Sequence, residues 1–278
     1  MADTDVLVIT GGAGGMGLAS ACALADRGRL LLVDVDEGQL EEARSMLSAR
    51  GASVETLRCD VTSPADVAAV ADRVRASGRF RCLVHTVGVS PEMADARTVI
   101  EVDLVGSARV TDAVFPLVEP GSSAILFGSI AGYSDVDPAI EKLLCDPLAD
   151  GLFSAVEQAL GQPMDSATAY VLAKRGVMRL TERLATPWGA KGGRVVTISP
   201  GLIDTAMGRM ELERQPIIPQ MIELTPVKRP ERPLPGRTDE IAALVAFLES
   251  DGAAFISGCD IRVDGGLVGA ARHMLGGA

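Results

Sequence analysis

The chain has 278 residues, of which 47% are hydrophobic, so it is long enough for one large domain with a sizeable core. Its formal net charge of −11 argues against nucleic acid or an anionic membrane as a partner, because both attract basic surfaces. Five cysteines without a CxxC pair and only two histidines make no zinc-site pattern, so no metal is expected. The N-terminus lacks the features of a signal peptide and no apolar run reaches the ~18 residues of a membrane span. These features predict a cytoplasmic protein.

Short apolar runs alternate with helical patterns along most of the chain. The expected strands are residues 5–10, 29–34, 53–58, 81–86, 123–128, 194–199 and 259–263. Helical patterns occupy residues 15–27, 38–50 and 64–77, and the last of them opens with Ser63 and Pro64, which are typical of helix starts. This alternation predicts an α/β fold, a single-domain Rossmann-type doubly wound parallel sheet of about seven strands spanning residues 1–278.

The first expected strand runs into the sequence TGGAGGMG, residues 10–17, and a helical pattern follows. Glycines permit a tight turn there and keep side chains away from a phosphate at the helix N-terminus. A tight turn without a ligand is the alternative, but the strand before and the helix after favour a dinucleotide site. Candidate contacts are Gly11, Gly15, Met16 and Gly17.

The second expected strand ends at Asp34. A carboxylate at that point can accept hydrogen bonds from both ribose hydroxyls of an adenosine, and it would repel a 2′-phosphate. No Arg or Lys stands at position 35 or within the glycine turn, so NAD is favoured over NADP as the cofactor. Asp36 is a rival for this role but lies past the expected strand end. Asp60, after the third strand, can face the adenine or cap the helix near Pro64, and the sequence leaves both open.

Tyr170 and Lys174 stand four residues apart in the sequence ATAYVLAKRG, so on a helix their side chains share a face. A phenol with a free pKa near 10 is a weak acid or base at neutral pH. A nearby ammonium favours the phenolate, lowers that pKa and makes the pair a usable proton donor or acceptor. Because the chain has only two tyrosines, this spacing is uncommon by chance.

Tyr-x-x-x-Lys on a helix, behind a turn of the form Thr-Gly-x-x-x-Gly-x-Gly, resembles the short-chain dehydrogenase/reductase family over nearly the whole chain. The resemblance implies that the tyrosine exchanges the proton, that the lysine also binds the nicotinamide ribose, and that a serine hydrogen-bonds the reacting oxygen. The serines ahead of the tyrosine are Ser166, Ser154, Ser134 and Ser129. Ser129 is chosen because it follows the fifth strand ahead of a small-residue turn. Its distance from Tyr170 implies an insertion of roughly 28 residues against the family spacing.

Other stretches fit the family or depart from it. The sequence SPGLIDT, residues 199–205, resembles the turn that contacts the carboxamide of the cofactor. The cofactor contacts that the resemblance adds are Asp60, Val61, Gly88, Pro200, Gly201, Ile203 and Thr205. Asp103 replaces a family Asn whose backbone carbonyl holds a relay water near the lysine, so a backbone role for this candidate catalytic residue survives and a side-chain role is in doubt. His85 is interpreted as a satisfied strand-end residue rather than a catalytic one.

Two segments interrupt the strand–helix rhythm, a helical insertion at 133–165 and a proline-rich substrate flap at 202–237. Leu148, Leu152, Val156 and Ala159/Leu160 form a helical stripe that packs on its own domain, caps the cleft or forms a dimer interface. The insertion is similar to that of bacterial 3α-hydroxysteroid dehydrogenases, in which it takes part in dimer contacts. A homodimer or homotetramer is therefore expected.

These observations predict an oxidoreductase that transfers hydride between NAD(H) and a secondary alcohol or ketone. The Met- and Ile-rich flap and the similarity to steroid enzymes favour a bulky apolar substrate, such as a steroid or terpenoid. One alternative is a 3-oxoacyl thioester reductase of the same family, which would more often use NADPH. Another is a NAD-sensing binding protein without catalysis, a class that commonly lacks the tyrosine or the lysine.

Overall fold

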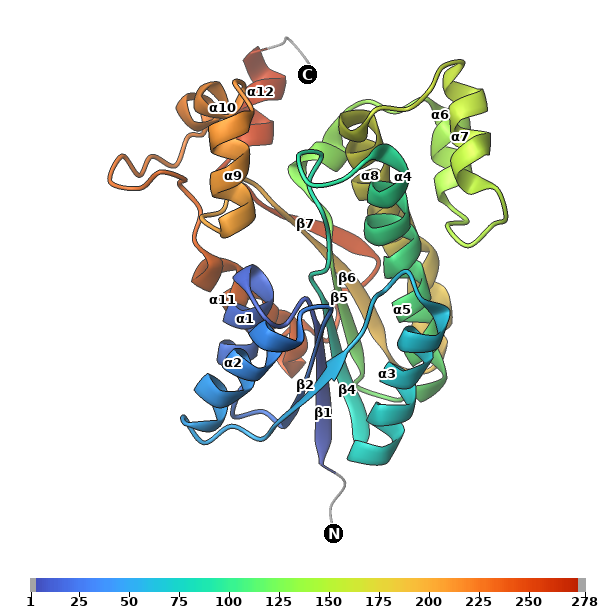
Figure 1. The fold of residues 1–278 in the computed structure, drawn as a ribbon, viewed down its shortest axis with the longest axis vertical. Coiled ribbons are helices and arrows are strands. Elements are labelled where there is room, and N and C mark those ends of the chain that lie inside the picture. Colours follow the sequence, from blue (N-terminus) through green and yellow to red (C-terminus); the bar gives the residue numbers. More distant parts are fainter. Residues whose placement is uncertain (1–3, 275–278) are drawn as a thin grey trace.

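A computed structural model describes residues 4–274 and contains one seven-stranded sheet in which every neighbouring pair of strands is parallel (Figure 1). The spatial order is β3-β2-β1-β4-β5-β6-β7. The strands are β1 (Asp5–Thr10), β2 (Arg29–Asp34), β3 (Val54–Arg58), β4 (Arg79–His85), β5 (Ser123–Phe127), β6 (Arg194–Pro200) and β7 (Cys259–Val263). The prediction of a doubly wound parallel sheet is confirmed.

Helices cover both faces of the sheet (Figure 1). One face is covered by α1 (Gly15–Ala23), α2 (Glu37–Ser48) and α11 (Thr238–Glu249). The other is covered by α3 (Pro64–Ser77), α4 (Ala96–Val99), the π-helix η1 (Ile100–Val105), α5 (Gly106–Val114) and α8 (Ser166–Ala190). The remaining elements are η2 (Phe115–Leu117), η3 (Ile130–Tyr133), α6 (Pro138–Leu144), α7 (Leu152–Leu160), α9 (Ala206–Arg214), α10 (Ile218–Leu224), η4 (Asp251–Ala253) and α12 (Leu267–Met274).

Burial of the strands explains their sequences. All residues of β5 and β6 are buried, as are the inner residues of β2, because each strand lies between two helical layers. The order of the strands reverses between β1 and β4, where the crossovers leave in opposite directions. In open α/β sheets, ligands bind outside the carboxyl ends of the strands at such a switch point, so the topology directs attention to that edge.

Local signals set the helix starts. The Ser63 hydroxyl accepts a hydrogen bond from the Asp66 amide at 3.3 Å and caps α3, as its sequence predicts. Helix α1 ends at Ala23, before the expected boundary at residue 27, because the chain must turn back into β2 and Gly28 packs against the Asp5 carbonyl.

Among residues 4–274, no helix combines the length and apolar character that crossing a membrane requires.

The segment 133–165 contains α6 and α7, which lie beside α4 and α8 (Figure 1). Leu152 and Val156 are buried in the core of their own domain, and Leu160 packs against it. Leu148 is 42% exposed and precedes α7, so the predicted helical stripe was wrong at that residue. Gly151, at φ 74°, separates Leu148 from the helix. The stripe therefore packs on its own domain from Leu152 onward.

Candidate active site

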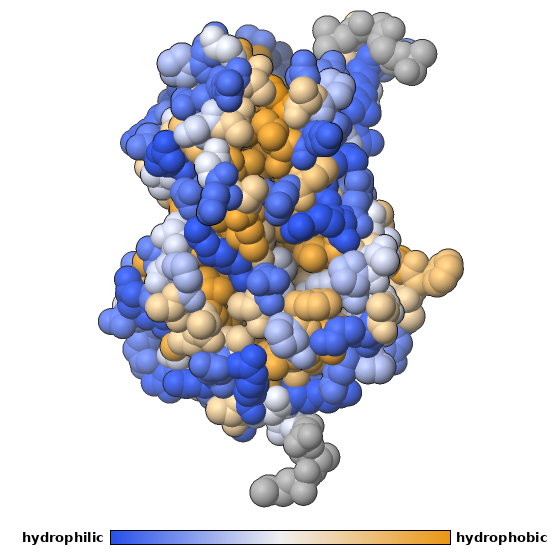
Figure 2. Space-filling model, turned by 90° about the vertical axis from the view of Figure 1, so that its right-hand side faces the viewer, coloured by the Kyte–Doolittle hydropathy of each residue, from blue (hydrophilic) through white to orange (hydrophobic). Residues whose placement is uncertain are grey.

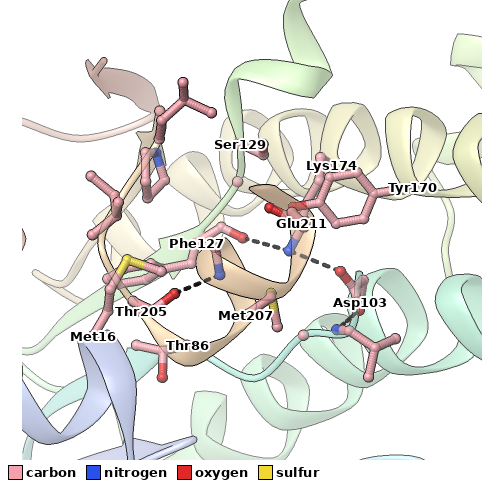
Figure 3. Close-up of a pocket in the computed structure, with 18 of the residues that line it drawn as sticks. Met16, Thr86, Asp103, Phe127, Ser129, Tyr170, Lys174, Thr205, Met207 and Glu211 are labelled. Atoms are coloured by element: carbon pink, nitrogen blue, oxygen red, sulfur yellow. Dashed lines mark hydrogen bonds and ion pairs between the residues drawn. The ribbon is translucent and has the colours of Figure 1, made fainter. Parts of the chain in front are cut away.

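A cavity of about 100 Å³ opens at the carboxyl ends of the strands (Figure 3). Its walls come from segments that follow β1, β4, β5 and β6, together with η1, α8 and the first turns of α9. The predicted site residues that line it are Met16, Gly88, Asp103, Ser129, Tyr170, Lys174, Pro200, Gly201, Ile203 and Thr205. The predicted residues that lie outside its lining are Gly11, Gly15, Gly17, Asp34, Asp60 and Val61. The structure thus brings the four catalytic candidates and part of the cofactor candidates to one cavity, and places the other cofactor candidates outside its lining.

Tyr170 and Lys174 project from α8 into the cavity. Asp165 caps this helix by accepting a hydrogen bond from the Thr168 amide at 2.7 Å, which fixes its first turn. The Lys174 ammonium lies 5.4 Å from the centre of the Tyr170 ring and 3.5 Å from the carbonyl oxygen of Phe127. Lys174 is only 6% exposed, so its charge acts in a poorly hydrated environment.

Ser129 follows β5 and faces the same cavity. Its hydroxyl accepts a hydrogen bond from the Ala131 amide at 3.2 Å. Ser129 also acts to lower the pKa of Tyr170, although burial outweighs it. Ser134 and Ser166 do not line the cavity, and Ser154 lines a different one. Of the four serines considered from sequence, only Ser129 lines the cavity that Tyr170 enters.

The side chain of Asp103 is buried beside Lys174 in the wall of the cavity. One carboxylate oxygen lies 2.9 Å from the Lys174 ammonium, and the other accepts a hydrogen bond from the Val89 amide at 2.8 Å. The doubt about a side-chain role is thereby corrected, because the Asp103 side chain is a buried partner of Lys174. Gly88 makes room for this pair, since a Cβ there would lie 3.1 Å from both charged groups. The Asp103 carbonyl accepts a hydrogen bond from the Ser107 hydroxyl at 2.6 Å.

The electrostatics of the site differ from the sequence-based expectation. Burial raises the pKa of Tyr170; Lys174 opposes this, but Asp103 and Glu211 reinforce it, and the net shift is upward. The expectation of a lowered pKa for Tyr170 was therefore wrong in sign, although Lys174 does act in the expected direction. Burial would lower the pKa of Lys174, yet the neighbouring Asp103 outweighs it and the pKa is raised. The buried carboxyl of Asp103 itself has a raised pKa, because burial outweighs Lys174.

Glu211, Thr86 and Phe127 line the cavity and were missed from sequence, whereas Met207 belongs to the Met- and Ile-rich flap that was expected to contact the substrate (Figure 3). Glu211 and Met207 enter from α9, Thr86 follows β4, and Phe127 ends β5. The Thr86 hydroxyl donates to the Thr10 carbonyl at 2.9 Å, which holds the segment after β4 against the glycine turn. Its position in HTVG, at a strand end, is a signal that could have identified it. Glu211 has no comparable signal, because a carboxylate in a polar helix is ordinarily solvated.

The glycine turn has the shape that a phosphate group needs. A Cβ on Gly17 would lie 2.0 Å from the Gly11 carbonyl oxygen, so the turn closes tightly at that point. Gly11 has φ 73° and Gly15 has φ 53°, values that favour glycine. A Cβ on Gly14 or Gly15 would meet no atom closer than 3.7 Å, so the N-terminus of α1 is open to a ligand. The residues present therefore fit a dinucleotide pyrophosphate.

Asp34 lies beside this turn. Its carboxylate accepts hydrogen bonds from the Ala13 amide at 3.2 Å and the Val35 amide at 2.8 Å. Asp36 instead caps α2 by accepting from the Gln39 amide at 3.0 Å, so it does not compete for the ribose. Arg58, the neighbour of Asp34 on β3, is paired with Asp66 at 3.2 Å.

Asp60, which follows β3, was expected either to face the adenine or to cap the helix near Pro64. Asp60 accepts hydrogen bonds from the Thr62 amide and hydroxyl, at 2.9 and 2.7 Å. Because Ser63 caps α3, the helix-capping alternative for Asp60 was wrong. The Val61 side chain is 4% exposed and packs on the site of Gly106, which leaves only its backbone to face a nucleotide.

His85 is buried at the end of β4 and does not line the cavity. Its Nδ1 lies 2.6 Å from the Thr10 hydroxyl, while its Nε2 has no partner among residues 4–274. Burial, reinforced by Lys174, lowers the pKa of His85 to about 3, so the imidazole is neutral. Within the same described range, no three His, Cys, Asp or Glu side chains gather in a way that could hold a metal ion.

Comparisons with known proteins agree with this layout. A family model described as short chain dehydrogenase matches residues 5–137, and one described as Enoyl-(Acyl carrier protein) reductase matches residues 154–268. The chain is 31% identical to a D-threitol dehydrogenase of Mycolicibacterium smegmatis, over 95% of this chain and 93% of the relative. It is 33% identical to a cis-4-hydroxycyclohexanecarboxylate dehydrogenase of Sinomonas cyclohexanicum, over 94% and 95%. A levodione reductase structure is 27% identical, with a TM-score of 0.77 over 97% of this chain and 99% of that one.

Proposed function

The chain belongs to the short-chain dehydrogenase/reductase family, and from this premise we propose that it transfers hydride between NAD(H) and a secondary alcohol or ketone. The observation that carries the proposal is the convergence of Ser129, Tyr170 and Lys174 on one cavity beside an open glycine turn. NAD(H), when bound, supplies or accepts the hydride. The two relatives described above are named as dehydrogenases of alcohols, which supports the reaction class.

The chain's own residues then have separate tasks. The Ser129 hydroxyl orients the reacting oxygen, and Tyr170 takes or returns its proton. Lys174 stabilises the phenolate electrostatically and binds the nicotinamide ribose, and Asp103 holds Lys174 in place. The glycine turn, with Gly15 and Gly17, binds the pyrophosphate, and the backbone at Ile203 and Thr205 contacts the carboxamide. Asp60, Val61 and Gly88 complete the proposed nucleotide contacts.

NAD is proposed rather than NADP because of Asp34. Its carboxylate stands beside the glycine turn, where it can bind ribose hydroxyls and would repel a 2′-phosphate. The nearest cation on the adjoining strand, Arg58, is engaged by Asp66. Isothermal titration of the protein with NADH and with NADPH tests this proposal, and tighter binding of NADPH would refute it.

The proposed substrate is a bulky apolar alcohol or ketone, such as a steroid or terpenoid. Apolar side chains that support it line much of the cavity, among them Val89, Phe127, Met207 and Leu234. The alternative of a 3-oxoacyl thioester reductase keeps some support from the description of one matching family model. A panel of steroids, terpenoids and acyl thioesters separates the two, since good turnover of the thioesters alone would refute the proposal.

The decisive experiment replaces Tyr170 by Phe, which removes the exchanging hydroxyl and keeps the ring. We expect turnover of a verified substrate to fall at least a hundredfold, in line with general acid–base catalysis, while NADH binding is retained. Retained turnover would refute the assignment. A wild-type protein that binds NADH but turns over no alcohol or ketone would support the alternative of a NAD-sensing protein instead.

We further propose a cytoplasmic homodimer or homotetramer. The side of the molecule that carries α5, α7 and α8 shows apolar side chains in a band between hydrophilic ones (Figure 2). Such a surface suits contact with a second copy of the chain. The contact would not use Leu152 and Val156 of α7, because both are buried in the core of their own domain. Light scattering after gel filtration tests the proposal, and a monomeric mass at micromolar concentration would refute it.

A further inference from the structure

We propose that Glu211 makes this cavity selective for neutral or cationic alcohols that carry a hydrogen-bond donor away from the reacting carbon, and that it excludes anionic ones. The inference rests on the proposed function, since it concerns the substrate of the same site. The substrate flap at 202–237 would then recognise the charge of the substrate and also make apolar contacts with it.

Glu211 is held over the cavity by the way α9 begins. The Thr205 hydroxyl caps the helix by accepting a hydrogen bond from the Gly208 amide at 3.0 Å. Gly208 packs against the main chain, since a Cβ there would lie 2.4 Å from the Ile203 carbonyl oxygen. Met207 and Glu211 are four residues apart, and both face the cavity (Figure 3). Glu211 is therefore three residues, less than one turn, beyond Gly208, where the helix packs against the main chain.

No side chain of the described residues pairs directly with the Glu211 carboxylate. Among residues 4–274 its carboxylate has no hydrogen-bond or ion-pair partner, because the nearby ammonium of Lys174 is paired with Asp103 at 2.9 Å. Glu92, on the loop after β4, adds a second negative charge that acts on Glu211. Arg214, at the end of α9, donates to the Glu92 backbone carbonyl at 3.3 Å.

The surroundings make this carboxylate matter for binding. Apart from the paired Asp103, it is the one carboxylate among the described residues that line the cavity, and its neighbours there include Val89, Met207 and Leu234. A half-buried carboxylate gains when a ligand supplies a hydroxyl or an ammonium, and it disfavours a second anion. Burial raises the pKa of Glu211, Glu92 reinforces this, and Lys174 opposes it, so the selectivity is expected to strengthen as the pH rises.

The test uses single-ring alcohols that differ only at carbon 4. The probes are cis-4-hydroxymethyl-, cis-4-aminomethyl- and cis-4-methylcyclohexanol and cis-4-hydroxycyclohexanecarboxylate, each assayed with NAD at pH 8 and 9. We expect kcat/KM for the carboxylate to be at least tenfold below that of the hydroxymethyl compound. Glu211→Gln should raise kcat/KM for the carboxylate at least tenfold and lower it for the ammonium compound. It should lower kcat/KM less for the hydroxymethyl compound, because the amide oxygen of Gln still accepts a hydrogen bond.

Glu213→Gln is the matched control, because Glu213 is exposed on the same helix and does not line the cavity. Equal effects of both variants, or a wild-type preference for the carboxylate, would overturn the inference while leaving NAD-dependent alcohol oxidation intact. If none of the four probes turns over, the same order is read from their binding to the enzyme–NADH complex by calorimetry. If the four probes bind with equal affinity, the inference is overturned. If their affinities follow the expected order but no compound in a wider alcohol panel is turned over, only the proposed function is overturned.

Discussion

Replacing Asp103 by Asn tests the electrostatic account of the site most directly. The substitution removes a buried negative charge from beside Lys174 and keeps an oxygen that can accept from the Val89 amide. Asp103 contributes to the raised pKa of Tyr170, so the variant should have a lower pKa at that tyrosine. Oxidation of an alcohol needs the phenolate, so its rate should rise at a lower pH than in the wild-type protein.

The size of the shift follows from the geometry. The Asp103 carboxylate lies 2.9 Å from the Lys174 nitrogen, which lies 5.4 Å from the centre of the Tyr170 ring. The carboxylate is therefore within about 8 Å of the ring, where two unit charges at an effective dielectric constant of about 20 interact by about 2 kcal/mol.

The assay is the pH dependence of kcat/KM for oxidation of a verified alcohol, measured for the wild-type protein and for Asp103→Asn. We expect the acidic limb of the profile to move toward lower pH, because the negative charge that raises the pKa of Tyr170 is removed. An unchanged limb, or a shift to higher pH, would refute the reasoning. Glu213→Gln, a change of charge on the exposed side of α9, should leave the limb in place.

Three further predictions concern the nucleotide end and the insertion. Gly17→Ala places a Cβ 2.0 Å from the Gly11 carbonyl oxygen and should cost about 3 kcal/mol of unfolding free energy in urea titrations, whereas Gly14→Ala, with 3.7 Å of clearance, should leave stability unchanged. Asp34→Ser should raise the affinity for NADPH relative to NADH about tenfold in calorimetry, and an unaltered ratio would contradict the role of that carboxylate. Leu152→Ala should lower the unfolding free energy by about 2–4 kcal/mol, and the exposed Leu148→Ala by no more than about 0.5 kcal/mol; equal losses would argue against burial of α7.

The fold could be predicted from sequence because its strands are buried on both faces. Near-continuous apolar runs such as RLLLVD indicate strands of a parallel sheet. The glycine turn marks the connection from the first strand to the first helix. The partnership of Tyr170 with Lys174 was also predictable, because helical spacing alone brings the two side chains to one face. Ser129 required the family resemblance, since its distance along the chain from Tyr170 gives no local signal.

What escaped prediction depends on contacts between distant segments. The ion pair of Asp103 with Lys174 forms where the π-helix η1 meets α8. It requires a glycine at position 88, because a Cβ there would crowd both charged groups. Glu211 reaches the cavity only because α9 folds back over the strand ends. Leu148 continued a plausible helical period, yet Gly151 starts the helix later. None of these outcomes is encoded in periodicity or composition.

The pair of Asp103 and Lys174 also sets a limit on how stable this protein can become. Two charges buried in a core cost desolvation energy that apolar side chains of similar volume would avoid. Replacing both partners together by apolar side chains is therefore expected to raise the resistance of the fold to heat, whereas replacing one partner leaves an uncompensated buried charge. Because the double replacement also removes Lys174, a screen for durability must be coupled to a screen for turnover.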